Sequence, residues 1–380
     1  MDFGLSEEKR LFRKTVSKFA RQEVAPIIEG LEETDEFPTK LFKKMGELGF
    51  LGIPFPDKYG GSEGDTMTLC ILAEEIAYFS VALAVSCIVQ TLGVAGPVFS
   101  FGTEEQKESI LIPSIKAEKI GAIAMTEPEA GSDVASIRTT ALKDGNDDYI
   151  INGTKMFCTM GNVADLYFVT AVTDPKKGIK GISLFVVERG TSGVRVSPNI
   201  KKLGLHGAGT VELSFEDCKV SKGNLLGEEN RGFYNLMRAL ERNRILVGIV
   251  GIGLARAAFD EANKYSKERV QFGKSISNFQ AVQFMLADMA MEIELATLMA
   301  YKTAWMYDQG QKCNKEASMT KLYCSEMANR VATNALQIHG GYGYMMEYNV
   351  QRYFRDARAL EIFEGTSQIQ RGIIARELGL

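Results

Sequence analysis

The stretch Ala359-Leu-Glu-Ile-Phe-Glu-Gly-Thr-Ser-Gln-Ile-Gln-Arg371 places a carboxylate between an apolar run and a closing helix. Within it, Glu364 follows the apolar pair Ile362-Phe363 and precedes the flexible Gly365. Apolar neighbours remove water from a carboxylate, which raises its pKa toward the range in which a general base works well. Thr366-Ser367 can cap the helix that follows, whose free N–H groups suit an anionic group of a cofactor. The alternative is a solvated carboxylate at a loop-to-helix junction.

Length and composition set the broad class. The 380 residues allow two or three domains, and 45% hydrophobic with 24% charged residues is typical of a soluble globular protein. A formal net charge of −4 favours neither nucleic acid nor an anionic membrane as a partner. The six cysteines form no CxxC pair, which argues against a zinc site or a disulfide scaffold and fits a reducing cytoplasm. The N-terminal residues lack a signal-peptide pattern, so the sequence predicts a cytoplasmic protein, with a processed mitochondrial form as the alternative.

One uncharged stretch, from Ile76 to Thr103, is long enough to suggest a membrane span. It contains the polar pair Gln90-Thr91 and the helix breakers Gly93 and Gly96-Pro97. Such residues favour helices buried inside a protein core, so the sequence predicts no membrane span.

Hydrophobic periodicity divides the chain into three parts. Apolar residues recur at helical spacing from Ser6 to about Ala117 and again from Gly232 onward. Between these parts, β-rich runs alternate with turn residues and predict a mostly antiparallel β domain that ends near Leu226. The runs are residues 149–159, 166–172, 182–187, 194–196 and 211–217. The sequence therefore predicts a mainly α protein with an N-terminal helical domain (1–117), a middle β domain (118–228) and a C-terminal helical bundle (229–380).

Two short motifs in the expected β domain could face one flat heterocycle. Thr126-Glu-Pro-Glu-Ala-Gly-Ser-Asp133 has glycine and small hydroxyl residues, which let backbone N–H groups approach a ligand closely. Phe157-Cys-Thr159 adds an aromatic face and a hydroxyl on a strand of the same domain. Neither motif is a nicotinamide-type GxGxxG or a P-loop. The alternative for the first motif is a surface turn.

Two further motifs interrupt the helical pattern of the last part. Arg269-Val-Gln-Phe-Gly-Lys274 could bind phosphate, and its alternative is a helix that ends at Gly273. Gln337-Ile-His-Gly-Gly-Tyr-Gly-Tyr344 permits close approach of the backbone to a cofactor. Its glycines most simply end a helix.

The remaining polar features have simple structural explanations. Glu241 and Arg244 lie on adjacent helical turns, a spacing typical of a solvated ion pair. His206 and His339 are the only histidines, and neither an HExxH nor an ExxH pattern accompanies them. The sequence therefore predicts no metal site.

Four of these motifs together resemble those of the flavin-dependent acyl-CoA dehydrogenase family, in the family's order and spacing. They are Met125-Thr-Glu-Pro-Glu-Ala-Gly-Ser-Asp133, Arg269-Val-Gln-Phe-Gly-Lys274, Gln337-Ile-His-Gly-Gly-Tyr-Gly343 and Phe363-Glu-Gly-Thr-Ser-Gln-Ile-Gln-Arg371. Each motif alone is weak, whereas the combination is specific, and the resemblance covers the whole chain. It implies the acyl-CoA dehydrogenase fold: an N-terminal helical domain, a β-barrel-like middle domain and a C-terminal four-helix bundle.

The resemblance also implies a homotetramer with FAD held between domains and subunits. The residues that it places against the flavin ring are Met125, Thr126, Phe157 and Thr159. The other implied FAD contacts are Ser132, Thr366 and Gln368 and, across the subunit boundary, Arg269, Phe272, Gln280, Gln337 and Gly341. Phe157 stands where many relatives carry tryptophan, a departure that keeps an aromatic wall.

Glu364 matches the position of the family's catalytic base. Some branches, such as the isovaleryl and long-chain enzymes, place that glutamate at the position of Asn243, and asparagine cannot act as a base. The implied reaction converts an acyl-CoA thioester to the trans-2-enoyl-CoA, with the α-proton taken by Glu364 and the β-hydride by flavin N5. In similar enzymes the thioester carbonyl is held by the backbone N–H of the base residue and a ribityl hydroxyl of FAD.

The substrate contacts are likewise implied by the resemblance. Those expected for CoA are Ser132, Glu241 and Arg244, and those expected for the acyl chain and thioester are Gln90, Thr91, Val94, Leu240, Phe363 and Gly365. No arginine or lysine lies between Ile76 and Thr103, which disfavours the glutaryl-CoA branch because that branch uses an arginine for the distal carboxylate. We therefore expect an uncharged short, medium, branched or alicyclic acyl-CoA.

The implied electron acceptor is an electron-transfer flavoprotein. A same-fold flavin oxidase or monooxygenase is the nearest alternative, because reactivity with oxygen depends on site access that a sequence does not show. A non-catalytic helical scaffold protein is the second alternative. Glu364 and Arg244 favour the dehydrogenase, since a scaffold needs no base and no flavin-facing residues.

Overall fold

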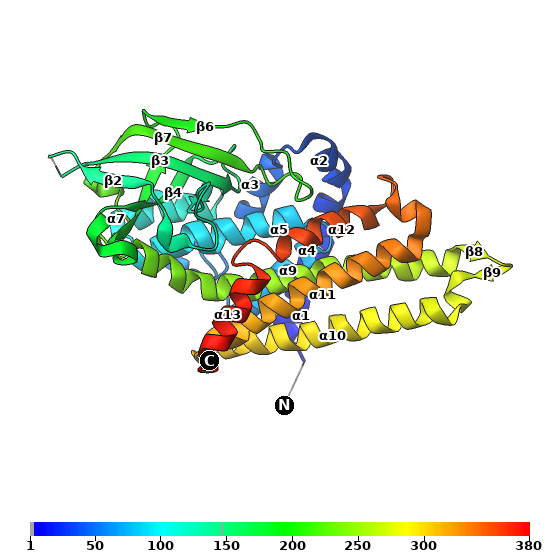
Figure 1. Ribbon diagram of the computed structural model, residues 1–380. Helices are drawn as coiled ribbons and strands as arrows, with labels where there is room; N and C mark the ends of the chain where they lie inside the picture. The colour runs from blue at the N-terminus through cyan, green and yellow to red at the C-terminus, as the bar shows by residue number, and fades with distance from the viewer. Residues whose placement is uncertain (1–3, 146) are drawn as a thin grey trace.

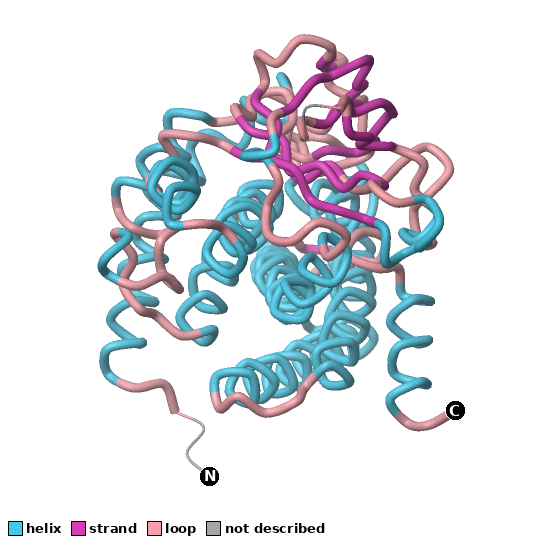
Figure 2. The backbone as a smooth tube through the Cα atoms, turned by 90° about the vertical axis from the view of Figure 1, so that its left-hand side faces the viewer, coloured by secondary structure: helices cyan, strands magenta, loops and turns pink. Residues whose placement is uncertain are grey.

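The computed structural model describes residues 4–145 and 147–380, apart from the side chains of residues 238–240. Figure 1 shows the strands of the middle part gathered in one body above the helices, with the N-terminal helices beside the long C-terminal ones. In the rotated view of Figure 2 the sheet again lies at one end of the helical body. The chain is therefore mainly α-helical with a central β domain, as the sequence predicts.

The N-terminal part is helical from Glu7 to Ile115. Ser6 caps its first helix by accepting a hydrogen bond from the backbone N–H of Lys9 at 3.3 Å. Helical backbone continues past Pro26 because this proline begins a new 3-10 turn, where its missing N–H needs no partner. The α-helices are α1 (Glu7–Phe19), α2 (Ile28–Thr34), α3 (Thr39–Glu47), α4 (Thr66–Ala77), α5 (Val81–Ile88), α6 (Gly96–Phe101), α7 (Glu104–Gln106) and α8 (Ile112–Ile115).

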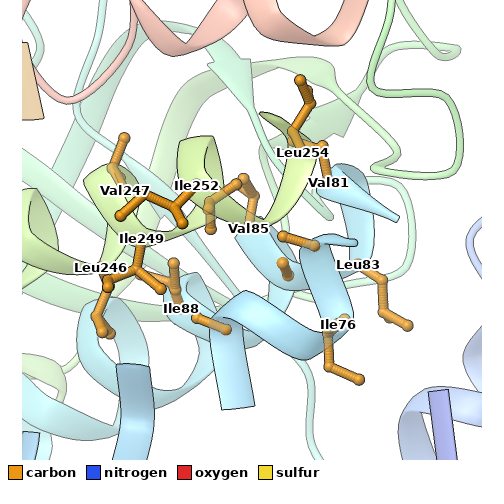
Figure 3. Close-up of a cluster of buried hydrophobic side chains, with 14 of the residues drawn as sticks. Ile76, Val81, Leu83, Val85, Ile88, Leu246, Val247, Ile249, Ile252 and Leu254 are labelled. Atoms are coloured by element: carbon orange, nitrogen blue, oxygen red, sulfur yellow. The ribbon is translucent and has the colours of Figure 1, made fainter. Parts of the chain in front are cut away.

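The uncharged stretch forms α5, the π-helical η4 (Val89–Ala95) and α6. Among the described residues, only Val81–Phe101 is apolar and long enough to cross a membrane, and 89% of its most apolar window is buried inside the protein. Figure 3 shows the reason: side chains of α5, such as Val85 and Ile88, pack in one cluster with side chains of a C-terminal helix, such as Ile249. Helix α5 therefore lies in the core between the N-terminal and C-terminal helical parts.

The middle part contains a seven-stranded sheet in the order β1-β4-β2-β3-β7-β6, with β5 added beside β4. Its strands are β1 (Gly121–Ala124), β2 (Thr140–Lys143), β3 (Tyr149–Cys158), β4 (Leu166–Val172), β5 (Ile182–Glu188), β6 (Val194–Val196) and β7 (Val211–Val220). Four strand pairs are antiparallel, and β4 pairs in parallel with β1 and β2. The sheet is thus mostly antiparallel, as predicted, although the short strands β1 and β2 were not among the predicted runs.

The C-terminal part is built on one long helix that contacts most of the others. Its helices are α9 (Gly232–Glu268), α10 (Gln280–Asp308), α11 (Asn314–His339), α12 (Asn349–Leu360) and α13 (Ser367–Glu377). Between α9 and α10 the chain forms a small hairpin of β8 (Val270–Gln271) and β9 (Lys274–Ser275), at the end of the molecule farthest from the sheet (Figure 1).

The alternative that a helix ends at Gly273 is wrong. The helix ends at Glu268, and Phe272 and Gly273 form the two-residue turn of the hairpin, with φ angles of 51° and 76°. Two consecutive positive φ angles give a turn whose twist matches that of a β-hairpin. Phe272 is left 94% exposed at the tip.

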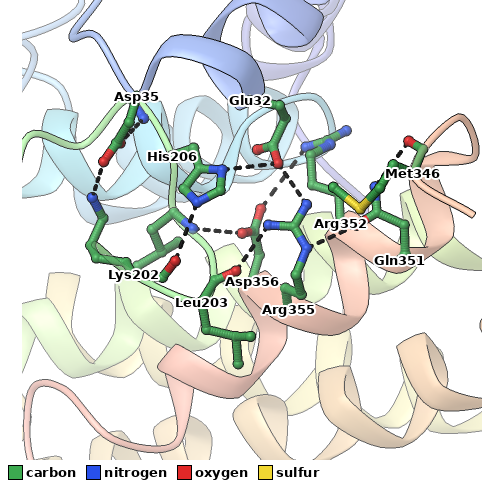
Figure 4. Close-up of polar contacts among 12 residues, drawn as sticks. Glu32, Asp35, Lys202, Leu203, His206, Met346, Gln351, Arg352, Arg355 and Asp356 are labelled. Atoms are coloured by element: carbon green, nitrogen blue, oxygen red, sulfur yellow. Dashed lines mark hydrogen bonds and ion pairs between the residues drawn. The ribbon is translucent and has the colours of Figure 1, made fainter. Parts of the chain in front are cut away.

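A polar cluster ties α2 and the loop before β7 to α12 (Figure 4). Arg355 donates to Glu32 Oε2 at 2.6 Å, and the same carboxylate oxygen lies 3.2 Å from Nδ1 of His206. Buried Asp356 accepts a hydrogen bond from the backbone N–H of Leu205 at 2.7 Å, and burial raises its pKa. Because α12 leads directly into the segment around Glu364, this cluster fixes the helix from which that segment begins.

Close packing of α3 against the chain after α8 gives a stability prediction. A Cβ atom at Gly46 would fall inside contact distance of the Lys116 carbonyl, whereas a Cβ at Gly30 meets nothing within 4 Å. We expect Gly46→Ala to lower the free energy of unfolding by about 1–3 kcal/mol, because backbone must move. Gly30→Ala should leave it unchanged or raise it by about 0.4–1 kcal/mol. Urea denaturation measures both, and equal effects of the two variants would contradict this packing.

Candidate active site

The loop between α12 and α13 has an unusual backbone. Glu364 and Gly365 both have left-handed φ angles, 54° and 87°. Glycine adopts this conformation freely, whereas for a residue with a Cβ it costs roughly 1–2 kcal/mol and requires support from its surroundings. After the turn, Thr366 caps α13 by accepting a hydrogen bond from the backbone N–H of Ile369 at 3.3 Å. The cap is therefore Thr366 and not Ser367.

Side chains from two helices hold the carbonyl groups of this turn. Gln370 Nε2 on α13 donates to the carbonyls of Glu364 and Gly365, at 3.0 and 3.1 Å. Lys321 Nζ on α11 donates to the carbonyl of Gly365 at 2.7 Å. These contacts fix the orientation of two successive peptide groups. They provide the support that the left-handed turn requires.

Glu364 is partly buried, and its carboxyl group has lost much of its contact with water. Loss of solvation raises its pKa above the ordinary value, although the charges of Arg244 and Lys321 and a side-chain hydrogen bond with Asn243 act in the opposite direction. Partial burial and the raised pKa favour the desolvated carboxylate over the solvated one. Asn243 forms a hydrogen bond with the same carboxyl group. Positions 243 and 364, at which relatives carry the base glutamate, therefore lie in one site.

Arg244 is not paired with Glu241, so the expectation of a solvated ion pair is wrong. Its Nη1 atom donates to Asn314 Oδ1 at 2.8 Å, and burial lowers its pKa while Glu364 and Glu241 raise it. Glu241 instead accepts a weak hydrogen bond from the thiol of Cys313 at 3.6 Å. A partly buried guanidinium therefore lies near Glu364, on the side where α11 begins.

The sheet contributes a second surface. The backbone N–H of Met156 donates to the carbonyl of Thr126 at 2.8 Å, which brings the loop after β1 beside Phe157. Phe157 has a left-handed φ of 58° and is 61% exposed, and Thr159, just after the end of β3, is partly exposed. An exposed aromatic face next to partly exposed Met125 is a suitable seat for a flat ring system.

A buried ion pair supports that surface from below. Lys155 is fully buried, and its Nζ atom binds Glu127 Oε1 at 2.7 Å and the carbonyl of Met125 at 3.2 Å. Glu127 also accepts from the backbone N–H groups of Arg138 and Thr139, at 2.6 and 3.0 Å. The motif forms a turn with exposed residues at its tip, and this polar network fixes the base of that turn on the sheet.

The residues expected at a subunit boundary lie elsewhere in this chain. Arg269 stacks over Tyr342 at 5.3 Å in an open pocket of about 560 Å³ at the hairpin end of the bundle. Gly341 lines this pocket, and Gln337 is exposed beside it. Phe272 and Gln280 are exposed on the hairpin and at the start of α10. One chain therefore does not bring these residues to Glu364.

The glycines of this region end a helix, as predicted. α11 stops at His339, and Gly340 follows with a φ of 58°. His339 stacks on Tyr265 at 4.2 Å, and its Nδ1 atom lies 2.8 Å from the carbonyl of Ala335. Among the described residues, no group of three or more His, Cys, Asp or Glu side chains could hold a metal ion.

The residues expected around the acyl chain are mostly inside the helical core. Gln90 is buried, and its amide binds the backbone of Ser114, Lys119 and Gly121 at 2.9–3.0 Å, so it links η4 to β1. Thr91 donates to the carbonyl of Leu51 at 3.2 Å. Both polar groups are thus used within the protein.

The other expected contacts differ in exposure. Val94 is fully buried, Phe363 is partly buried against the main core, and Ser132 and Gln368 are exposed. The side chain of Leu240 lies outside the described residues. Glu364, Gly365 and Arg244, by contrast, are brought together.

Two buried lysines, Lys155 and Lys321, were missed by the sequence analysis. Lys321 is preceded by Ala317 and followed by Cys324 at helical spacing, so it falls on the buried face of α11. A lysine on an apolar helical stripe is the signal that could have found it. For Lys155, the alternation of β3 places it on the inward face of the sheet.

Comparison with known proteins agrees with this geometry. Models of the N-terminal, middle and C-terminal domains of acyl-CoA dehydrogenases match residues 6–118, 122–218 and 230–379. The chain is 46% identical to the probable acyl-CoA dehydrogenase YngJ of Bacillus subtilis over the full length of both, and 45% identical to the caffeyl-CoA reductase-Etf complex subunit CarC of Acetobacterium woodii over 97% of this chain and 98% of the other. The solved structure of butyryl-CoA dehydrogenase from Megasphaera elsdenii is 39% identical, with a TM-score of 0.97 over all of both chains.

The fold and the site thus define a flavin-dependent oxidoreductase. The chain belongs to the acyl-CoA dehydrogenase family. It is an acyl-CoA dehydrogenase, and its cofactor is FAD.

The described residues fit this cofactor. Phe157 and Thr126 offer an exposed ring face beside a loop of small residues, and the capped start of α13 at Thr366 offers free N–H groups for a phosphate. Arg269 in the open pocket can hold the distant part of a cofactor bound by a second chain.

The raised pKa of Glu364 gives a stability prediction with a definite sign. The unfolded carboxyl ionises near 4.5 and the folded one at higher pH, so the folded state loses stability as pH rises between the two values. We expect Glu364→Gln to raise Tm at pH 7 and to leave it unchanged at pH 4. The control is Glu361→Gln in the same loop, which loses an ion pair with Arg358 at 2.7 Å and should not raise Tm. A lower Tm of Glu364→Gln at pH 7 would contradict the desolvated carboxyl.

Proposed function

We propose that the protein oxidises an uncharged acyl-CoA to the trans-2-enoyl-CoA, with Glu364 as the base that removes the α-proton. The observation that carries this proposal is the desolvated carboxyl of Glu364 on a supported left-handed turn, beside the partly buried cation Arg244. A thioester α-proton is too weakly acidic for a carboxylate in water, so the base must be desolvated and aimed. Asn243 cannot replace Glu364 in this role, because its amide does not accept a proton.

The chain's own groups supply the other requirements. The backbone N–H of Glu364 donates to no other group among the described residues, which leaves it available for the thioester oxygen as negative charge develops there. Arg244 and Glu241 on α9 contact Asn314 and Cys313 at the start of α11, and we expect the CoA part of the substrate to bind beside them. FAD, when bound, supplies the acceptor for the hydride that leaves the β-carbon.

The substrate class is supported by charge. From α5 to α6 the buried wall has no basic side chain that could pair with a second carboxylate, and the amide of Gln90 is already engaged. A short, medium, branched or alicyclic acyl group without charge meets this wall at no desolvation cost. The similarity to a butyryl-CoA dehydrogenase structure supports placing short chains first.

We also propose an electron-transfer flavoprotein as the electron acceptor, a homotetramer as the assembly and the cytoplasm as the location. The first is supported by the similarity to a subunit of a reductase-Etf complex. The homotetramer is supported by an exposed apolar face of α10 and by the exposed side chain of Phe272. That face consists of Phe284, Met291, Leu295, Leu298 and Trp305. The six cysteines are all free and buried, which fits a reducing compartment.

The test of the activity is anaerobic bleaching of the flavin by butyryl-, octanoyl-, isobutyryl-, isovaleryl-, cyclohexanecarboxyl- and glutaryl-CoA. We expect fast bleaching by an uncharged thioester, slowed by about 10²–10⁴-fold in Glu364→Gln, because removal of a general base has that effect. The rise in Tm of the same variant at pH 7 shows that it is folded. Bleaching that survives Glu364→Gln would reject the assigned base. Rapid reoxidation in air would favour the oxidase, and no bleaching by any thioester would favour a scaffold.

The tetramer is tested on the apolar face of α10. Leu295→Glu and Leu298→Glu together should dissociate the assembly, because two charges would be buried in the interface. Size-exclusion chromatography with light scattering measures the mass, and the flavin content should fall in parallel. Leu11→Glu, at a leucine that is 65% exposed on α1, is the matched control and should change neither. A wild-type monomer with full flavin content would reject the assembly.

A further inference from the structure

A buried ammonium group lies directly beneath the base loop. Lys321 on α11 has a fully buried side chain, and its Nζ atom donates to the carbonyl of Gly365 at 2.7 Å. An ammonium has three N–H groups, yet within the described part of the chain this carbonyl is its only hydrogen-bond acceptor. A buried cation is unfavourable unless a negative charge lies near it. A packing role alone would not need the charge.

The negative charge that remains for Lys321 is that of Glu364. The charged groups around the ammonium are Arg244 on α9, Glu326 on α11, Arg358 and Glu361 at the end of α12, and Glu364 and Arg371 in the last segment. Two of these acids are already paired with arginines, at 2.7 and 2.8 Å. Burial lowers the pKa of Lys321 to about 8, while Glu364 acts most strongly in the opposite direction. Lys321 in turn lowers the pKa of Glu364.

The contact also acts on the backbone. Glu364 and Gly365 are the two left-handed residues of the loop, and the direction of their peptide groups decides where the Glu364 side chain points. Lys321 holds the second carbonyl from α11, and Gln370 holds both from α13. The turn is therefore fixed from two sides, once by a charged donor and once by a neutral one.

We propose that Lys321 is a positioning residue for the base: it holds the Gly365 carbonyl so that the left-handed turn aims Glu364 into the site, and its charge balances the carboxylate that the turn buries. This rests on the proposed function of Glu364. Gln370 provides the matched neutral anchor of the same turn.

The first measurement is the pH profile of the flavin-bleaching rate constant with butyryl-CoA. Lys321→Met keeps the length of the side chain and removes the charge, and Gln370→Met removes the neutral anchor. Both variants should be slower at every pH, but only Lys321→Met should move the acid limb, upward by about one pH unit, because a positive neighbour lowers the pKa of a carboxylate. Below the limb this shift lowers the rate about tenfold further. An unmoved limb in Lys321→Met, or an equal shift in Gln370→Met, would overturn the proposal.

The second measurement does not depend on turnover. Tm at pH 7 is compared among the wild type, Lys321→Met, Glu364→Gln and the double variant. Lys321→Met should raise Tm more in the Glu364→Gln background than in the wild type, since the buried ammonium has then lost its counter-charge. Equal changes in both backgrounds would show that the two charges are not coupled and would overturn the proposal.

The two measurements separate the two proposals. If none of the thioesters bleached the flavin of the wild type, the proposed function would fail. The Tm cycle would still decide whether Lys321 is coupled to Glu364. If the wild type bleached but the limb and the cycle were unchanged in Lys321→Met, the proposed function would stand and the role of Lys321 would fail.

Discussion

The exclusion of water from one carboxylate, Glu364, is the constraint on which the rest of the site depends. An ionised carboxyl group without water is unfavourable, and the protein offsets this with fixed cations and hydrogen-bond donors instead of with solvent. Arg244 comes from α9, Lys321 from α11, and Gln370 from α13, so three helices must be in register before Glu364 takes up this environment. The polar cluster on α12 then fixes the helix that leads into the loop.

Buried ion pairs recur wherever helices or loops from distant parts of the sequence must meet. Lys155 and Glu127 hold the loop that follows β1. Arg13 of α1 pairs with Glu74 of α4 at 3.1 Å. Arg256 of α9 pairs with Glu75, also on α4, at 3.1 Å. Such pairs contribute little net stability, but a wrong register would leave a buried charge unpaired. They therefore select one arrangement of the elements over others of similar apolar burial.

The fold class and the raised pKa of Glu364 could be predicted from the sequence, because each depends on a local pattern. The period of apolar residues separated helices from strands, and the position of Glu364 after an apolar pair indicated a desolvated carboxyl. The hairpin at Phe272-Gly273 was not predicted, because a two-residue β-turn after a long helix has no periodicity of its own. The predicted partner of Arg244 was wrong. Spacing along one helix indicated Glu241, whereas Arg244 donates to Asn314 on another helix. Lys321 and Lys155 were missed because their roles depend on contacts between elements far apart in sequence.

The packing of α5 against α9 has a consequence for the synthesis of the chain. The apolar side chains of residues 81–101 leave the ribosome early, but the helix that covers them is made only after the whole sheet has been translated. During that interval, roughly ten seconds or more at ordinary elongation rates, an uncharged helix long enough to enter a bilayer packs against α4 but lacks its later partner α9. The nascent protein is therefore expected to need a holding chaperone at this stage, so that its strongest core element does not aggregate or engage the membrane-targeting machinery first.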